Sequence, residues 1–189
     1  TREDMFDSHS YAKGGRVLHM LRKYLGDEAF FAGLKKYLED NKFSSVEMHN
    51  LRLAFEAVTG EDLNWFFNQW FFDNGHPDLS IYYDYNETDK TTSVTIYQIQ
   101  DTTIAPIYVL PMAVDIYANG KVERKQIVMD KAIQIFTFPT ETRPDLINVD
   151  AEKMLLCTKL DNKSLEEYLF QLQHAPLFLD RYEAIENIA

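Results

Sequence analysis

This sequence of 189 residues contains a single cysteine, no long apolar run and fewer basic than acidic residues. The lone Cys157 excludes an internal disulfide and a thiolate metal cluster, and its apolar neighbours Met154 to Leu156 predict a buried core position. No segment is long and apolar enough to predict a membrane span, and no secretory signal opens the chain. The formal net charge of -11 disfavours nucleic acids and anionic membranes as partners, because both require a basic surface.

Closely spaced metal ligands are also missing. Two histidines on one turn of helix need a spacing of four residues, as in His-Glu-x-x-His. The chain has five histidines, which are His9, His19, His49, His76 and His174. The residues four positions after them cannot complete a histidine pair, and they are Lys13, Lys23, Leu53, Ser80 and Phe178. The sequence therefore predicts no metal-ligating residues within this chain.

Nucleophile and phosphate motifs are absent as well. The chain has neither a Gly-x-Ser-x-Gly elbow nor a phosphate-cradling glycine loop, so no cofactor-binding residues are predicted. The paired acids Glu166 and Glu167 point about 100° apart on a helix and cannot form a catalytic dyad. Tyr11 is the one remaining candidate, as a hydrogen-bond donor to a developing negative charge. On residue type alone, packing of its ring at a helix start is the commoner role.

The apolar pattern of the first third predicts helices. The chain is 46% hydrophobic, which favours a folded protein over disorder. Apolar residues recur at helical spacing over about 17–25, 30–38 and 51–58, with Gly26 and Gly60 as stops. Ser44 and Glu47 fit a capping box for the third helix. A fourth helix, about Glu61 to Asp73, is apolar nearly all round and should be buried on several sides.

From Leu79 onward the apolar period changes to two. The expected strands cover about 79–85, 94–96, 110–116, 121–129, 133–138 and 146–149. Asn119-Gly120 predicts a tight hairpin turn, because both central residues must take positive φ. Short strands at this spacing indicate an antiparallel β-sandwich. The helical period returns at Leu165, and a second helix is expected from Arg181, so the fold class is α+β.

Several segments resemble one known family in the same order along the chain. Tyr11-Ala12-Lys13-Gly14 resembles the catalytic-tyrosine helix of zinc aminopeptidases of the aminopeptidase-N (alanyl aminopeptidase, gluzincin) family. The stretches 25–38 and 51–60 are similar to the next two helices of that family. Phe66, Trp70 and Gly75-His76-Pro77 are similar to the aromatic helix and Gly-x-Pro that lead into its sandwich domain.

The resemblance implies three domains and a role for Tyr11. Residues 1–77 would be the helical end of a thermolysin-like catalytic domain, 78–160 the β-sandwich, and 161–189 the first helices of a C-terminal helical domain. The full-length enzyme would remove amino-terminal residues from peptide substrates. The hydroxyl of Tyr11 would help to stabilise the tetrahedral intermediate.

The resemblance also implies what lies outside this sequence. The zinc ligands, the general base and the loop that holds the substrate's amino terminus should precede Thr1, in a missing N-terminal catalytic half. We therefore expect zinc in the full-length enzyme, and no peptidase activity from this chain alone. Part of the aromatic surface of the fourth helix should drive self-association of the isolated chain.

One other reading stays open. The chain would then be a non-catalytic protein-binding module on an aminopeptidase-like scaffold, because sandwiches host many functions. The sequence predicts a soluble chain and leaves its compartment open between cytoplasm and periplasm or extracellular space. It does not determine the residue preference of the enzyme.

Overall fold

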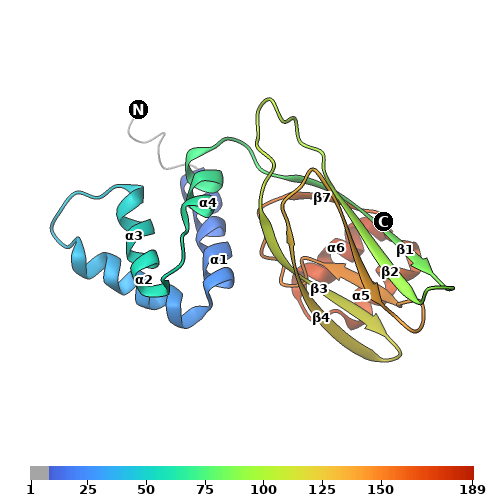
Figure 1. Ribbon diagram of the computed structural model, residues 1–189. Coiled ribbons are helices and arrows are strands. Elements are labelled where there is room, and N and C mark those ends of the chain that lie inside the picture. Colours follow the sequence, from blue (N-terminus) through green and yellow to red (C-terminus); the bar gives the residue numbers. More distant parts are fainter. Residues whose placement is uncertain (1–8) are drawn as a thin grey trace. The chain divides into compact units, whose positions relative to one another are not determined.

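The computed structural model describes residues 9–189, which form two compact units (Figure 1). The first unit comprises the chain up to Gly75 together with a second, short segment, Thr103–Pro106. The second unit comprises His76–Thr102 and Ile107–Ala189. The assignment of residues 1–77, 78–160 and 161–189 to three domains stays a prediction. Within the described part of the chain, no helix combines the length and apolar character that a membrane crossing requires.

The regular elements of the first unit among the described residues are all helices. Its elements in chain order are η2 (His9–Lys13), α1 (Gly14–Leu25), α2 (Asp27–Asp40), α3 (Met48–Thr59), α4 (Asn64–Phe67) and η3 (Asn68–Phe72), where η marks a π-helix. Gly26 and Gly60 follow α1 and α3 with φ of +80° and +74°, which confirms them as stops.

The predicted capping box of the third helix is wrong. Helix α3 begins at Met48, and the backbone N–H of Glu47 donates to Asn50 Oδ1 at 2.8 Å. The hydroxyl of Ser44 instead donates to the carbonyl of Asn41, so it belongs to the preceding turn. Serine, asparagine and glutamate all compete for such local bonds, and the sequence alone did not show which residue would begin the helix.

Aromatic rings hold α2 against α3. The rings of Phe30 and Phe55 stack with centroids 5.4 Å apart, and Phe55 is completely buried. A Cβ atom on Gly33 would lie 2.3 Å from Phe55 Cδ1, so only glycine allows this close approach of the helix to the ring. Leu21, Leu63 and Phe67 are fully buried in the same unit.

The fourth helix is shorter and less regular than predicted. The α-helical part covers only Asn64–Phe67, and the chain continues as the π-helical turn η3. Leu63, Phe66, Phe67 and Trp70 are buried as expected of a helix with several apolar faces. Phe72, however, is 61% exposed, so the end of this helix presents an aromatic side chain to solvent.

The second unit contains two β-sheets (Figure 1). Its strands are β1 (Asp78–Asn86), β2 (Thr91–Gln98), β3 (Leu110–Ala118), β4 (Lys121–Met129), β5 (Ile133–Pro139), β6 (Leu146–Val149) and β7 (Thr158–Asp161). One sheet has the order β5-β2-β1-β7 and the other β4-β3-β6. The α+β class is confirmed, and Asn119 and Gly120 take φ of +53° and +69° in the β3–β4 turn, as predicted.

Strand β7 was not predicted, and it pairs parallel to β1, whereas the other pairs are antiparallel among the described residues. Ser80 is opposite Leu160 in this pair. Four residues with a single apolar side chain, that of Leu160, give too little periodicity for a prediction. The chain then forms α5 (Leu165–His174) and α6 (Phe178–Ile188), which belong to the same compact unit as the sheets.

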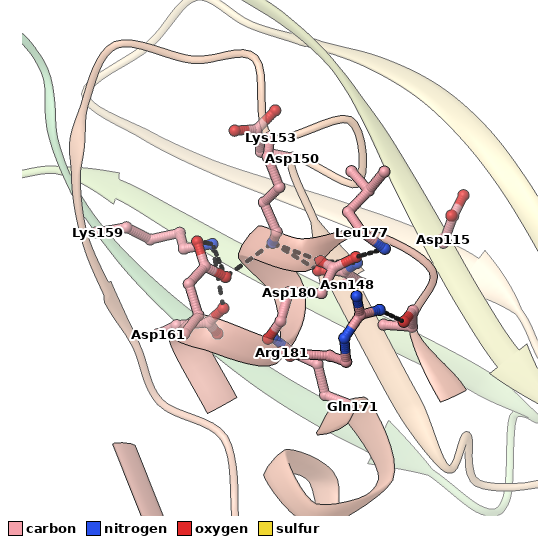
Figure 2. A network of polar contacts seen from close by, with 12 residues as sticks. Asp115, Asn148, Asp150, Lys153, Lys159, Asp161, Gln171, Leu177, Asp180 and Arg181 are labelled. Atoms are coloured by element: carbon pink, nitrogen blue, oxygen red, sulfur yellow. Dashed lines mark hydrogen bonds and ion pairs between the residues drawn. The ribbon is translucent and has the colours of Figure 1, made fainter. Parts of the chain in front are cut away.

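A buried cluster of charged side chains joins these helices to the sheets (Figure 2). The Nζ atom of Lys153 lies 3.1 Å from Asp180 Oδ1 and 2.8 Å from Glu183 Oε2, both on α6. It also donates to Asn148 Oδ1 on β6 at 2.9 Å. The side chains of Lys153 and Asp180 are 3% and 0% exposed, so the ion pair is shielded from water.

Two more lysines extend the cluster toward β1 and β7. Lys159 on β7 contacts Glu183 on α6 at 3.1 Å. Lys163 contacts Asp161, whose Oδ1 atom also accepts a 2.6 Å hydrogen bond from the Tyr83 hydroxyl on β1. Three lysines and three carboxylates, Asp161, Asp180 and Glu183, therefore meet between one sheet edge and α6.

The environment shifts the pKa values of these groups in opposite directions. Burial lowers the pKa of Lys163 to about 8, although Asp161 partly offsets it. Burial alone would lower the pKa of Lys159 too, but Asp161 and Glu183 raise it above the usual lysine range. Burial would raise the pKa of Asp161, but Lys163 and Lys159 hold it below its usual range.

Replacement of Lys153 tests the buried cluster. We expect Lys153→Met to lower the free energy of unfolding by about 3–5 kcal/mol, because Asp180 would stay buried without its cationic partner. Lys125→Met, which removes an exposed pair with Glu123, should cost at most about 1 kcal/mol. The measurement is chemical denaturation followed by circular dichroism. Equal losses of unfolding free energy in Lys153→Met and Lys125→Met would contradict the assignment of Lys153 to a buried ion pair.

The pH dependence of stability tests Lys163. Its folded-state pKa of about 8 lies below the unfolded value of 10.5, so between these pH values the folded state holds fewer protons and stability rises with pH. Relative to Lys163→Met, the unchanged chain should gain about 2 kcal/mol in unfolding free energy between pH 8 and pH 10. Lys131→Met, at an exposed site, should keep that gain. Parallel curves for the chain and Lys163→Met would refute the pKa shift.

Candidate functional site

The candidate catalytic residue Tyr11 lies in the middle of η2, at the start of the described chain. The π-helical turn passes directly into α1, since Lys13 at the junction has helical dihedrals, φ -64° and ψ -49°. Single π-helical turns are frequent at functional sites. The family resemblance implied a helix at Tyr11, whereas the apolar periodicity began only at about residue 17, and neither gave a sign of the π-helical turn.

The side chain of Tyr11 is 65% exposed. Tyr108, Tyr117 and Tyr168, by contrast, are buried, as is usual for a tyrosine that serves packing. A phenol at an exposed position can be reached by a group outside the chain, and its O–H is a hydrogen-bond donor. Burial in a closed core would have excluded that role. The assignment of Tyr11 as a catalytic residue stays a prediction.

A tertiary hydrogen bond links this segment to a distant part of the first unit. Lys13 Nζ donates to the backbone carbonyl of Gly75 at 3.2 Å, across 62 residues of sequence. Gly75 has φ of +81°, a value that glycine adopts without strain. Two of the segments that carried the family resemblance, Tyr-x-Lys-Gly and the Gly-x-Pro, are thus in direct contact.

The described residues offer no metal site. Residues 9–189 contain no group of three or more histidine, cysteine, aspartate or glutamate side chains that could hold an ion. His76 instead lies 3.5 Å from Asp78, and the ring of His174 lies 4.2 Å from that of Phe170. Cys157 is only half-buried, so the prediction of a buried core position for it is wrong. The side chains that are present do not fit a zinc centre.

Sequence reasoning did not find the concave surface of the second unit. Three neighbouring cavities of about 190, 430 and 500 Å³ lie along α5. The first two share Arg143 and Pro144, and the last two share Asp145 and Phe170. Their linings include charged residues of both signs, among them Arg143, Asp145 and Glu167. No motif marked this surface, because loop and helix residues far apart in sequence form it.

Comparison with known proteins gives a consistent result. Residues 1–70 match the family model described as the Peptidase family M1 domain. Aminopeptidase N from Lactococcus lactis subsp. lactis is 42% identical over 77 residues, which is 40% of this chain and 9% of that protein. Aminopeptidase N from Escherichia coli (strain K12) is 27% identical over 199 residues, which is 94% of this chain and 22% of that protein.

A solved structure has the same fold. The crystal structure of Legionella pneumophila aminopeptidase A in complex with aspartic acid matches 98% of this chain and 22% of its own, with a TM-score of 0.84 and 20% sequence identity. The chain spans between 9% and 22% of the length of these relatives. The likeness of fold therefore concerns only a limited part of each larger protein.

Titration with zinc tests the absence of a metal site. We expect no stoichiometric high-affinity binding of Zn²⁺ to residues 1–189, because the described part holds no cluster of ligands. Isothermal titration calorimetry is the measurement, with a competing chelator to set the affinity range. One tightly bound ion per chain would contradict the expectation, and loss of that binding in His9→Ala would trace it to the chain's start.

Proposed function

This chain belongs to peptidase family M1, and on that premise we propose that it is part of a zinc-dependent aminopeptidase, in which Tyr11 stabilises the oxyanion of the tetrahedral intermediate. The family match over residues 1–70 and the two aminopeptidase N relatives support this activity. The observation that supports the role of Tyr11 is the exposure of its side chain. Its helical segment is attached to Gly75 by the hydrogen bond from Lys13.

The proposed chemistry of Tyr11 is that of a neutral donor. As the scissile carbonyl carbon becomes tetrahedral, its oxygen gains negative charge, and the phenol O–H donates a hydrogen bond to it. A donor aimed at the developing charge lowers the barrier by about 3–4 kcal/mol, because the bond is stronger in the transition state than in the ground state. A hydrogen bond of this kind requires no proton transfer, so the same donor serves in every catalytic cycle.

Zinc binding and water activation are proposed for the whole protein and not for this chain. The described residues do not fit a metal centre, so no catalytic step in this chain passes through zinc. The ligands and the general base would come from an N-terminal catalytic half, which would be this chain's partner together with the peptide substrate. On this proposal residues 1–189 alone do not hydrolyse peptides.

Self-association of the isolated chain is part of the same proposal. Phe72 at the end of η3 is 61% exposed, and Phe31 and Phe43 of the first unit are exposed as well. Exposed aromatic side chains favour association with other apolar surfaces. The alternative function, a protein-binding module, would use the same side chains without any catalysis. An upstream coding sequence with His-Glu-x-x-His and a later glutamate favours the enzyme, and its absence favours the binding module.

Replacement of Tyr11 tests the catalytic role. In the complete protein, Tyr11→Phe should lower kcat by about 10²- to 10³-fold and leave KM nearly unchanged, because the lost bond is made mainly in the transition state. Steady-state kinetics on an aminoacyl substrate is the measurement. Tyr82→Phe, an exposed tyrosine of the second unit, should keep full activity. Equal activity of Tyr11→Phe and the unchanged enzyme, or turnover by residues 1–189 alone, would contradict the proposal.

A further inference from the structure

The hydrogen bond from Lys13 to Gly75 connects the Tyr11 segment to the opposite end of the first unit's helical chain. Its donor is the last residue of η2, two positions after Tyr11. Its acceptor is a backbone carbonyl three residues after η3. A contact between residues 62 positions apart constrains both segments, because neither can rotate without losing it.

The position of Lys13 relative to Tyr11 allows Lys13 to orient Tyr11. Residues two positions apart on a helix point in roughly opposite directions, about 200° apart in α geometry. A contact that holds Lys13 on one side of the segment therefore turns Tyr11 to the other side. Lys13, the residue before α1, makes no side-chain capping bond to the first turn of that helix.

The acceptor is itself anchored in the first unit. Trp70 on η3 is 4% exposed, so the chain that leads to Gly75 starts from the core. The N–H of Asn74 donates to Asp73 Oδ1 at 2.8 Å, in the segment between η3 and Gly75. The positive φ of Gly75 then sets the direction of its carbonyl group, and a residue with a Cβ atom would be strained there.

We infer that Lys13 is a positioning residue that sets the direction of the Tyr11 hydroxyl through its hydrogen bond to the Gly75 carbonyl. The contribution of Lys13 to catalysis rests on the proposed function, whereas its effect on the orientation of Tyr11 does not. The lysine side chain spans the gap to the carbonyl, and its charge strengthens the bond to that neutral acceptor. Arginine can make the same kind of bond, whereas methionine retains only the apolar part of the side chain.

The first experiment uses residues 1–189 and measures the ring of Tyr11 by NMR with ¹³C-labelled tyrosine, assigned with Tyr11→Phe. Lys13→Met and Gly75→Ala should each shift the Tyr11 ring resonance and increase its mobility. The double variant should change it no further, because Lys13→Met removes the donor of this bond and Gly75→Ala, by disfavouring the positive φ, displaces its acceptor carbonyl. Lys13→Arg should restore the original resonance, and Lys35→Met, at an exposed site on α2, should leave it unchanged.

The thermal midpoint of each variant shows whether the first unit still folds. A Lys13→Met chain with an unchanged midpoint and an unchanged Tyr11 ring would overturn the inference. Additive changes in Lys13→Met and Gly75→Ala would overturn it too, since the two residues would then act separately. Should Gly75→Ala fail to fold, the comparison of Lys13→Met with Lys13→Arg still decides the outcome.

The second experiment uses the complete protein and separates the inference from the proposed function. Lys13→Met should lower kcat by about 10- to 100-fold at nearly constant KM, because a small misplacement of a catalytic group slows chemistry more than binding. A large effect of Tyr11→Phe with none of Lys13→Met would refute the positioning role alone. No effect of Tyr11→Phe would refute the proposed function, and the NMR result would then still decide whether Lys13 orients Tyr11.

Discussion

The pairing of three lysines with three carboxylates, largely shielded from water, ties α6 to the strands of the second unit. A charge that leaves water must find a partner at hydrogen-bond distance, because an unpaired buried charge costs several kcal/mol. Lys153 meets this requirement through Asp180 and Glu183 of α6 and Asn148 of β6, and Asn148 also donates to Asp180. The helices α5 and α6 are therefore held in one place on the sheets, whereas apolar packing alone would tolerate several (Figure 2).

In the first unit, a much weaker polar contact also connects segments that are distant in sequence. The bond from Lys13 to Gly75 is exposed, so it adds little to stability, but it is directional. Tyr11 lies two residues away on the same helical segment, and its side chain extends into solvent. A segment that must present one hydroxyl in one direction needs orientation more than it needs burial. The core of this unit, built on Phe55, Leu63 and Phe67, provides the rigid support.

Much of the fold was predictable because it follows from local patterns. Apolar residues at period 3.6 and period 2 identified the helices of the first unit and six of the seven strands. The helix ends and the hairpin turn lie where they were expected, at Gly26, Gly60 and Asn119-Gly120. Glycine and Asn-Gly mark such sites in the sequence because they adopt positive φ readily. Strand β7 escaped prediction because four residues paired with a distant strand show no period of their own. The start of α3 was misplaced because neighbouring polar side chains compete for the same cap.

The sequence by itself determined the α+β class, the order of the elements and Tyr11 as the candidate site, since periodicity, turn residues and a short motif are all properties of neighbouring residues. Only the tertiary structure decided that Tyr11 is exposed, that Lys13 reaches Gly75, and that the charges of β7 and α6 are buried together. These facts depend on which distant segments meet in space. Hydrogen bonds and ion pairs across 20 to 60 residues leave no repeated spacing in the chain, so no reading of the sequence in isolation reveals them.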